Sequence, residues 1–185
     1  TKGREQVSLL DIFEIPLLAP MPEAGQPENW SINLNQPWVH LGSLVPNNQL
    51  AQAITEAPSG IWNAGYGHSD RIVSNHPTVE DSGSSLVIVK PESGEFVLQR
   101  LGADPWHNYS RKRSLLKLLY KGDTYWLNVT DDDYANKNFA KSFPEEASSD
   151  SRTIPLKGNE LVCVSLTPIF KGNHYKVAAT ILSIP

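Results

Sequence analysis

The sequence predicts a mainly β protein built from short strands. Its 185 residues include 14 Pro and 12 Gly, and this density of turn residues favours short strands over long helices. Five Trp, six Tyr and five Phe supply large side chains for a core. Two apolar runs flank Lys121-Gly122-Asp123, which is the pattern of a β-hairpin over 111–131.

The N-terminal part of the chain predicts strands separated by a long loop. Residues 7–18 are apolar and β-branched, and they predict a strand interrupted at Pro16. Residues 20–37 are rich in Pro, Asn and Gln and predict a loop, and loops of this length are often functional. Residues 38–44 predict a short strand.

A helix is predicted near 48–56, because Asn47 or Asn48 provides a cap and Pro58 provides an end. The apolar face of this helix consists of Leu50, Ala53, Ile54 and Ala57.

The loop over 61–81 is the most unusual part of the sequence. Its glycines permit backbone angles that other residues avoid, and several polar side chains lie close together in it. We expect its polar and aromatic residues to contribute selectivity or stacking to a binding site; they are Asn63, Tyr66, His68, Asp70 and Arg71.

The C-terminal half predicts three hairpins and a short helix. The hairpins are expected over 86–90 with 96–101, 111–120 with 124–129, and 161–166 with 175–182. The acidic run at 131–133 predicts a cap for a helix over 134–141. Residues 143–158 are polar and predict a loose connection or flap.

Alternation along the central hairpin predicts two different faces. One face carries Leu116, Leu118 and Tyr120 and is expected to join the core. The other face carries Arg113, Leu115, Lys117 and Leu119, a mixture that is typical of a partly exposed, ligand-facing surface.

Composition excludes several classes of protein. The net charge of −4 and a pI near 5.7 count against a non-specific nucleic-acid binder, although they leave room for a local basic patch. Cys163 is the single cysteine, so neither an intramolecular disulfide nor a zinc site with several cysteines is available. The sequence contains no phosphate loop, dinucleotide fingerprint or nucleophile elbow, and we expect no cofactor.

No apolar run reaches the length of a membrane span, and the N-terminal residues lack the apolar segment of a signal peptide. We therefore expect a cytoplasmic protein without membrane contact.

A metal-dependent hydrolase centred on His68, Asp70 and His76 is one alternative, because two histidines and a carboxylate can bind a divalent ion. Their spacing matches no recognised pattern, and polar loop residues usually satisfy backbone groups, so we expect no metal.

The dense basic stretch of the chain lies in the first strand of the central hairpin. It consists of Arg111, Lys112, Arg113 and Lys117, and the aromatic residues Tyr120, Tyr125 and Trp126 are interleaved with it. Positive charge next to aromatic rings suits a single nucleic-acid strand, whose phosphates need cations and whose bases need stacking surfaces. A solvated strand edge, where lysines prevent aggregation, explains the same pattern without a ligand.

Several blocks of the sequence together resemble the dual OB-containing domain family, prokaryotic proteins thought to serve in conflict or defence systems. The blocks are 9–18, Pro27-Glu28-Asn29, the Asn-x-Gly-x-x-x-x-Asp-Arg-Ile shape from Asn63 to Ile72, Ser84-Ser85-Leu86, Val129-Thr130-Asp131, 161–166 and 175–179. Their order and spacing hold over nearly the whole chain.

The resemblance implies two small OB-like β-barrels packed together, with one or two short helices. We expect residues 1–83 to form the first unit, without its N-terminal strand and with the helix near 48–56, and residues 84–185 to form the second. OB barrels bind oligonucleotides on a strand face and on the adjoining loops.

The sequence therefore predicts a non-catalytic module that binds or senses nucleic acid, single-stranded or modified, in a prokaryotic defence system. Arg111, Lys112, Arg113 and Lys117 are expected to meet phosphates. Tyr66, Tyr120 or Tyr125 is expected to stack bases, and Asn63, His68, Asp70 and Arg71 to give polar selectivity. The alternative is a protein-interaction subunit that docks onto an effector enzyme, which the acidic balance favours.

Overall fold

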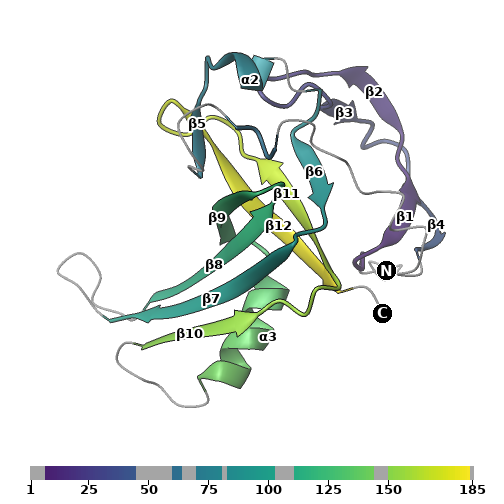
Figure 1. Cartoon of the computed structure of the whole chain (residues 1–185). Helices are drawn as coiled ribbons and strands as arrows, with labels where there is room; N and C mark the ends of the chain where they lie inside the picture. Colours follow the sequence, from purple (N-terminus) through teal and green to yellow (C-terminus); the bar gives the residue numbers. More distant parts are fainter. Residues whose placement is uncertain are drawn as a thin grey trace.

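The computed structural model describes residues 7–44, 60–63, 70–80, 83–102, 111–143 and 150–183. Strands dominate these residues (Figure 1), which confirms the mainly β prediction. The strands are β1 (Asp11–Glu14), β2 (Leu17–Pro20), β3 (Trp30–Ile32), β4 (Val39–Ser43), β5 (Arg71–Val73), β6 (Leu86–Val89), β7 (Ser93–Leu101), β8 (Arg111–Tyr120), β9 (Asp123–Val129), β10 (Asp150–Pro155), β11 (Glu160–Leu166) and β12 (Asn173–Ser183). The described helices are α2 (Pro77–Glu80) and α3 (Asp132–Ser142). The helix expected near 48–56 lies outside the described residues.

The C-terminal strands pair in the order of a small, partly open Greek-key barrel, with β10 and β6 at the two ends of the sheet. Strand β7 pairs with β8, β8 pairs with β9, and β9 pairs with β12 in parallel. Strand β12 then pairs with β11, β11 with β6, and β10 with β7. Strands β6 and β7 follow each other along one segment of the chain, and β10 and β11 follow each other along another. These two segments pair through the β10–β7 and β11–β6 ladders, whose registers differ by a single residue. The pairing order therefore returns to the β6–β7 segment from which it started. Five segments in this order, with a helix between the third and the fourth, give the architecture of an OB fold.

The hairpin of β8 and β9 has the predicted boundaries and turn. Lys121 and Gly122 both adopt positive φ, 52° and 79°, which is the backbone of a tight turn whose twist matches that of the flanking strands. The final hairpin of β11 and β12 is also confirmed. Helix α3 covers the predicted 134–141, and Asp131 caps it by accepting a hydrogen bond from the Tyr134 N–H.

Three predictions about local structure are wrong. Strands β6 and β7 do not pair with each other as a hairpin, because β6 pairs with the distant β11 and β7 pairs with β8 and β10. Residues 143–158 include the edge strand β10, which pairs with β7 through its backbone in spite of its polar sequence. Residues 20–37 include β3, which pairs with β2.

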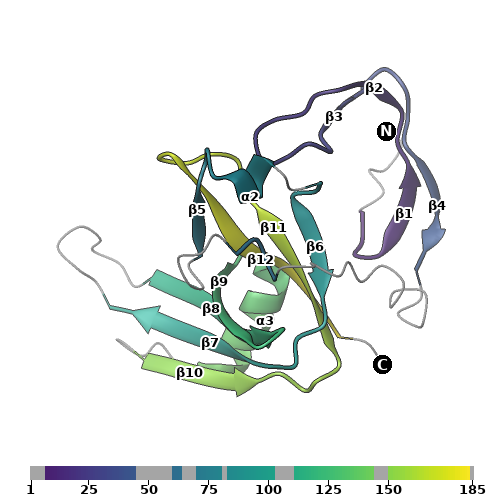
Figure 2. The same ribbon diagram turned by 45° about the horizontal axis from the view of Figure 1, so that its top comes forward.

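The N-terminal strands lie to one side of the barrel, next to β6 (Figure 1 and Figure 2). They form two separate two-stranded sheets, β1 with β4 and β2 with β3. Side-chain hydrogen bonds join this region to the barrel. The Gln26 amide donates to the Leu166 carbonyl at 3.2 Å, and one Glu28 carboxylate oxygen accepts hydrogen bonds from the N–H and the hydroxyl of Ser85.

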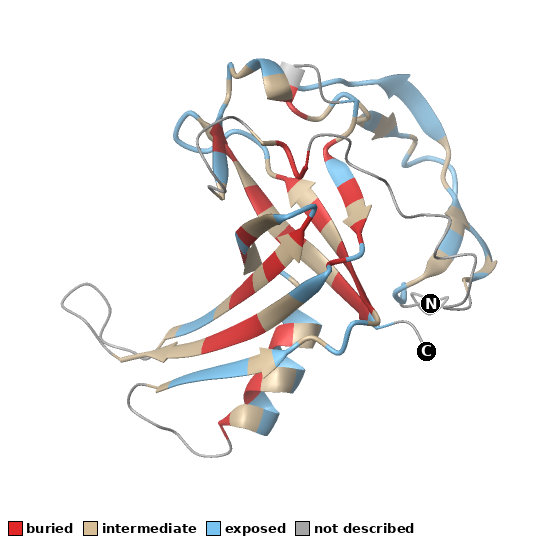
Figure 3. Ribbon diagram, viewed as in Figure 1, coloured by how far each residue is buried: buried red, intermediate tan, exposed pale blue. Residues whose placement is uncertain are grey.

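The core lies inside the barrel, and buried residues concentrate on its strands (Figure 3). Phe96, Leu98, Leu116, Leu118 and Leu127 are fully buried there. Helix α3 adds Ala135 and Phe139 to the same cluster.

Residues on both sides of the expected division near 83 share this core, since Ile61, Ile72 and Val79 belong to the same cluster as the C-terminal strands. The division into residues 1–83 and 84–185 stays a prediction. Among the described residues, no helix is long and apolar enough to cross a membrane.

Candidate nucleic-acid interface

The outer face of the barrel at β7, β8 and β9 carries charged and aromatic side chains in cross-strand register. We use outer face for the side that bears Glu95, Arg113, Lys117, Thr124 and Trp126. Glu95 pairs with Lys117, and Lys117 pairs with Trp126, so these three residues form a row across the three strands. The opposite side, the inner face, bears the core leucines, because successive residues of a strand point to opposite sides.

Lys117 is at the centre of this row. Its ammonium lies 3.8 Å from a Glu95 carboxylate oxygen and 5.6 Å from the centroid of the Trp126 ring. Trp126 is 45% exposed, although its strand neighbours Tyr125 and Leu127 are fully buried. Arg113 is exposed farther along the same face. The outer face therefore offers cations and a ring together at the protein surface.

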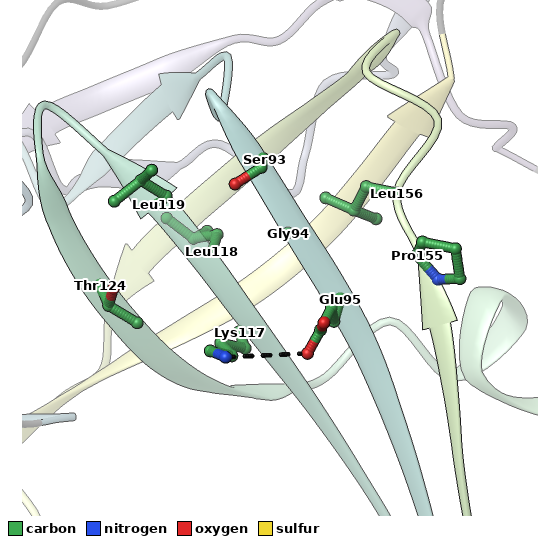
Figure 4. Close-up of a pocket in the computed structure, with 9 residues that line it drawn as sticks. All are labelled: Ser93, Gly94, Glu95, Lys117, Leu118, Leu119, Thr124, Pro155 and Leu156. Atoms are coloured by element: carbon green, nitrogen blue, oxygen red, sulfur yellow. Dashed lines mark ion pairs between the residues drawn. The ribbon is translucent and has the colours of Figure 1, made fainter.

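A hollow of about 370 Å³ opens on this face beside the Glu95–Lys117 pair (Figure 4). Its polar side chains are Ser93, Glu95, Lys117 and Thr124. The rest of its lining comes from Gly94 and Leu118 of the inner-face register and from Leu119, Pro155 and Leu156. The hollow adjoins the row but does not include Trp126.

The inner face of the same hairpin holds a buried polar network. The Tyr125 hydroxyl accepts a hydrogen bond from the Ile61 N–H at 3.1 Å and donates one to the Asn63 side-chain oxygen at 2.9 Å. The Asn63 amide in turn donates to the Asp123 carboxylate at 2.8 Å. Burial raises the pKa of Tyr125, an effect that its hydrogen bonds with Ile61 and Asn63 oppose. This network joins the segment around Asn63 to the interior of the barrel.

Lys176 extends this interior cluster from β12. Its side chain is almost completely buried, and its ammonium lies 5.7 Å from the centroid of the Tyr125 ring. Burial lowers the pKa of Lys176 to about 8, and the negative charge of Asp70 acts in the opposite direction. The Lys176 N–H also donates to the Asp70 carbonyl at 2.8 Å. A buried lysine with a lowered pKa is one feature of functional sites, although structural networks produce it as well.

The structure separates the residues that the sequence placed in one interface. Arg113 and Lys117 lie on the outer face, whereas Asn63 contacts Tyr125 on the inner face. Tyr120 and Tyr125 are both buried, so the expectation that either ring stacks a base does not fit their positions. Tyr66 and His68 lie outside the described residues.

The basic stretch is also divided by the alternation of β8. Arg111 falls in register with Arg113, whereas Lys112 lies on the other side, with its ammonium 5.4 Å from the Phe139 centroid of α3. Arg100 and Arg152 cover Phe143 from the same side, at 5.3 and 5.6 Å. Lys112 therefore covers one ring of the stacked Phe139–Phe143 pair, which is a structural role.

Asp70 and Arg71 lie at the edge of the barrel near β5. Their charged groups are 3.6 Å apart, and the Arg71 guanidinium lies 6.0 Å from the centroid of Tyr175. His76 accepts a hydrogen bond from the Thr78 N–H through its Nδ1 atom at 3.2 Å. The described part of the chain contains no group of three or more His, Cys, Asp or Glu side chains arranged to hold a metal ion.

Trp126 is the candidate residue that sequence reasoning did not select. The run Tyr125-Trp126-Leu127 contains three large side chains, and only their alternation against Leu116 and Leu118 shows which of them points outward. That pairing register identifies Trp126 as the ring offered to solvent.

Comparison with known proteins agrees with the pairing order of the barrel. The sequence model of the dual OB-containing domain matches residues 1–181, which is nearly the whole chain. No curated protein and no solved structure matches the chain.

Proposed function

Because the chain belongs to the dual OB-containing domain family, we propose that it binds single-stranded nucleic acid across the outer face of β8 and β9. In an OB fold the second and third strands provide the surface that takes oligonucleotides. In this chain those strands are β8 and β9, as their pairing order shows.

The observation that carries the proposal is the adjacency of Lys117 and Trp126. A cation 5.6 Å from an exposed indole ring provides one group for a phosphate and one for a stacked base. Arg113 adds a second exposed cation along the same strand. A net charge of −4 for the whole chain is compatible with a local group of cations.

The proposal is tested by the binding of fluorescent single-stranded oligonucleotides of about 12 nucleotides, a length within the span of one or two OB faces. Trp126→Ala is expected to weaken binding by about 1–3 kcal/mol, since it removes one stacking surface. Trp30→Ala is the matched control, because Trp30 is similarly exposed but lies in β3, away from the barrel face. Equal binding by the wild type and Trp126→Ala, or no binding at low salt, contradicts the proposal.

The proposal includes a role in a prokaryotic defence system. The support for this setting is the family resemblance alone. Infection of cells that express the wild type or Trp126→Ala tests it, and the same susceptibility to phage in both strains would contradict it.

Attachment to a protein effector is a second candidate function, and the N-terminal strands favour it. Large apolar side chains are exposed there, including Leu18, Trp30, Trp38 and Leu41. Within residues 7–44, Gly25 is the only buried residue. Exposed apolar surface of this extent marks interaction sites. Recovery of a stable partner whose binding survives nuclease treatment, and is lost in Leu18→Ser with Leu41→Ser, would support this function.

A further inference from the structure

We propose that the hollow beside Glu95 and Lys117 binds a guanine base of the single strand, so that the outer face selects guanine-containing sequences. This inference rests on the proposed function and assigns the base that one part of the face takes. It starts from the position of a carboxylate on a surface that is otherwise suited to phosphates.

Glu95 is unfavourable for a surface that binds only the phosphate backbone. Its carboxylate lies in the row with Lys117 and Trp126 and reduces the positive potential there. Both partners of the Glu95–Lys117 pair are exposed, since 47% of the Glu95 side chain and 41% of the Lys117 side chain are accessible to solvent. Exposed pairs of this kind add little to stability. A ligand can therefore rearrange the pair at small cost, and the carboxylate is available to accept hydrogen bonds from a base.

The hollow has the dimensions and lining that a base needs. A volume of about 370 Å³ lies at the lower end of the range for small-molecule sites. Leu119, Pro155 and Leu156 offer apolar surface to the faces of a planar ring, while Ser93, Glu95, Lys117 and Thr124 offer polar groups to its edge (Figure 4). Bases removed from a stack are read in this way, by apolar contact with the ring and hydrogen bonds to the Watson–Crick edge.

The edge chemistry selects guanine among the common bases. Ionised Glu95 has two acceptor oxygens, and the Watson–Crick edge of guanine presents two adjacent donors, the ring N1–H and the 2-amino group. The Lys117 ammonium has three donors, so it can offer one to the O6 acceptor of guanine next to that carboxylate and another to a phosphate. Thymine offers a single donor on this edge, and cytosine and adenine offer only one amino group each, so none of them fills both carboxylate oxygens.

The experiment compares three thymidine oligonucleotides of about 12 nucleotides. One has only thymine, one has a central guanine, and one has inosine in place of that guanine. Inosine keeps the N1–H and the O6 atom but lacks the 2-amino group. Wild-type protein is expected to bind the guanine oligonucleotide roughly tenfold more tightly than the inosine one at fixed salt.

Glu95→Ala is expected to remove this discrimination and to bind the guanine and inosine oligonucleotides alike. Glu92→Ala is the matched control, because it removes one exposed carboxylate three residues away that does not line the hollow. It is expected to retain the tenfold preference.

The outcomes separate this inference from the proposed function. Equal affinity of the wild type for all three oligonucleotides overturns the inference and leaves single-strand binding intact. A preference for guanine that persists in Glu95→Ala also overturns it. The absence of binding to any of the three overturns the proposed function and the inference with it.

Discussion

The inner and outer faces of the β8–β9 hairpin are formed by alternate residues of the same strands, and they differ in burial. Tyr125 and Trp126 are adjacent aromatic residues, yet the first is fully buried and the second is 45% exposed. Lys176 and Lys117 show the same contrast for a charge, since the first is buried against Tyr125 and the second lies at the surface over Trp126. The same residue types therefore hold the barrel together on one face and are available to a ligand on the other.

The largest expected effect concerns stability on the inner face. Tyr125→Ala removes a fully buried ring and both hydrogen bonds of its hydroxyl, and we expect a loss of about 3–5 kcal/mol in the free energy of unfolding. Trp126→Ala is expected to change it by less than about 1 kcal/mol, because an exposed side chain leaves no cavity. Denaturant unfolding of both variants measures the difference. Similar losses for the two variants would remove the basis for treating the faces as different.

Lys176 provides the second test, through the pH dependence of stability. Its pKa of about 8 lies below the ordinary value of 10.5, so folding disfavours its charged form. The penalty is fully present below pH 8 and disappears as pH rises to about 10.5, because the unfolded chain binds more protons in that interval. At about 1.4 kcal/mol per pKa unit, Lys176→Met is expected to stabilise the protein by up to about 3 kcal/mol at pH 7.

The stability difference between Lys176→Met and the wild type should shrink as pH rises from 8 towards 10.5, and unfolding at several pH values measures it. Destabilisation by Lys176→Met at pH 7 would mean that the contacts of the ammonium with the Tyr125 ring and Asp70 outweigh its desolvation.

The sequence predicted the elements whose partners are near in the chain. The β8–β9 and β11–β12 hairpins carry their turn residues and alternation locally, and α3 carries its cap at Asp131. The sequence did not predict that β6 pairs with β11 and that β10 pairs with β7, because those ladders join residues at least about 50 positions apart. The Pro-Glu-Ser-Gly run at 91–94 has the composition of a turn, and only long-range pairing shows that the chain continues through it.

The candidate site was predicted only in part, because local patterns do not specify contacts between distant segments. Alternation identified Lys117 and Arg113 as outward residues, and it was correct for both. Alternation also placed Tyr120 on the core face, yet Tyr120 and Tyr125 were selected as stacking rings, and both are buried. The contact of Asn63 with Tyr125 depends on a segment that approaches from more than 60 residues away, which no local pattern specifies.

The smallest expected effect compares two lysines of one strand. Lys117 faces outward, whereas Lys112 lies over the Phe139 ring on the other side of β8. If single-stranded nucleic acid crosses the outer face, Lys117→Ala removes one phosphate contact and reduces the slope of log K against log salt by about 0.7. Lys112→Ala is expected to leave the slope unchanged and to cost about 0.5–1 kcal/mol of stability through the lost ring contact. Binding titrations at four salt concentrations measure both slopes, and a reduced slope in Lys112→Ala with none in Lys117→Ala would place the strand on the face that α3 occupies.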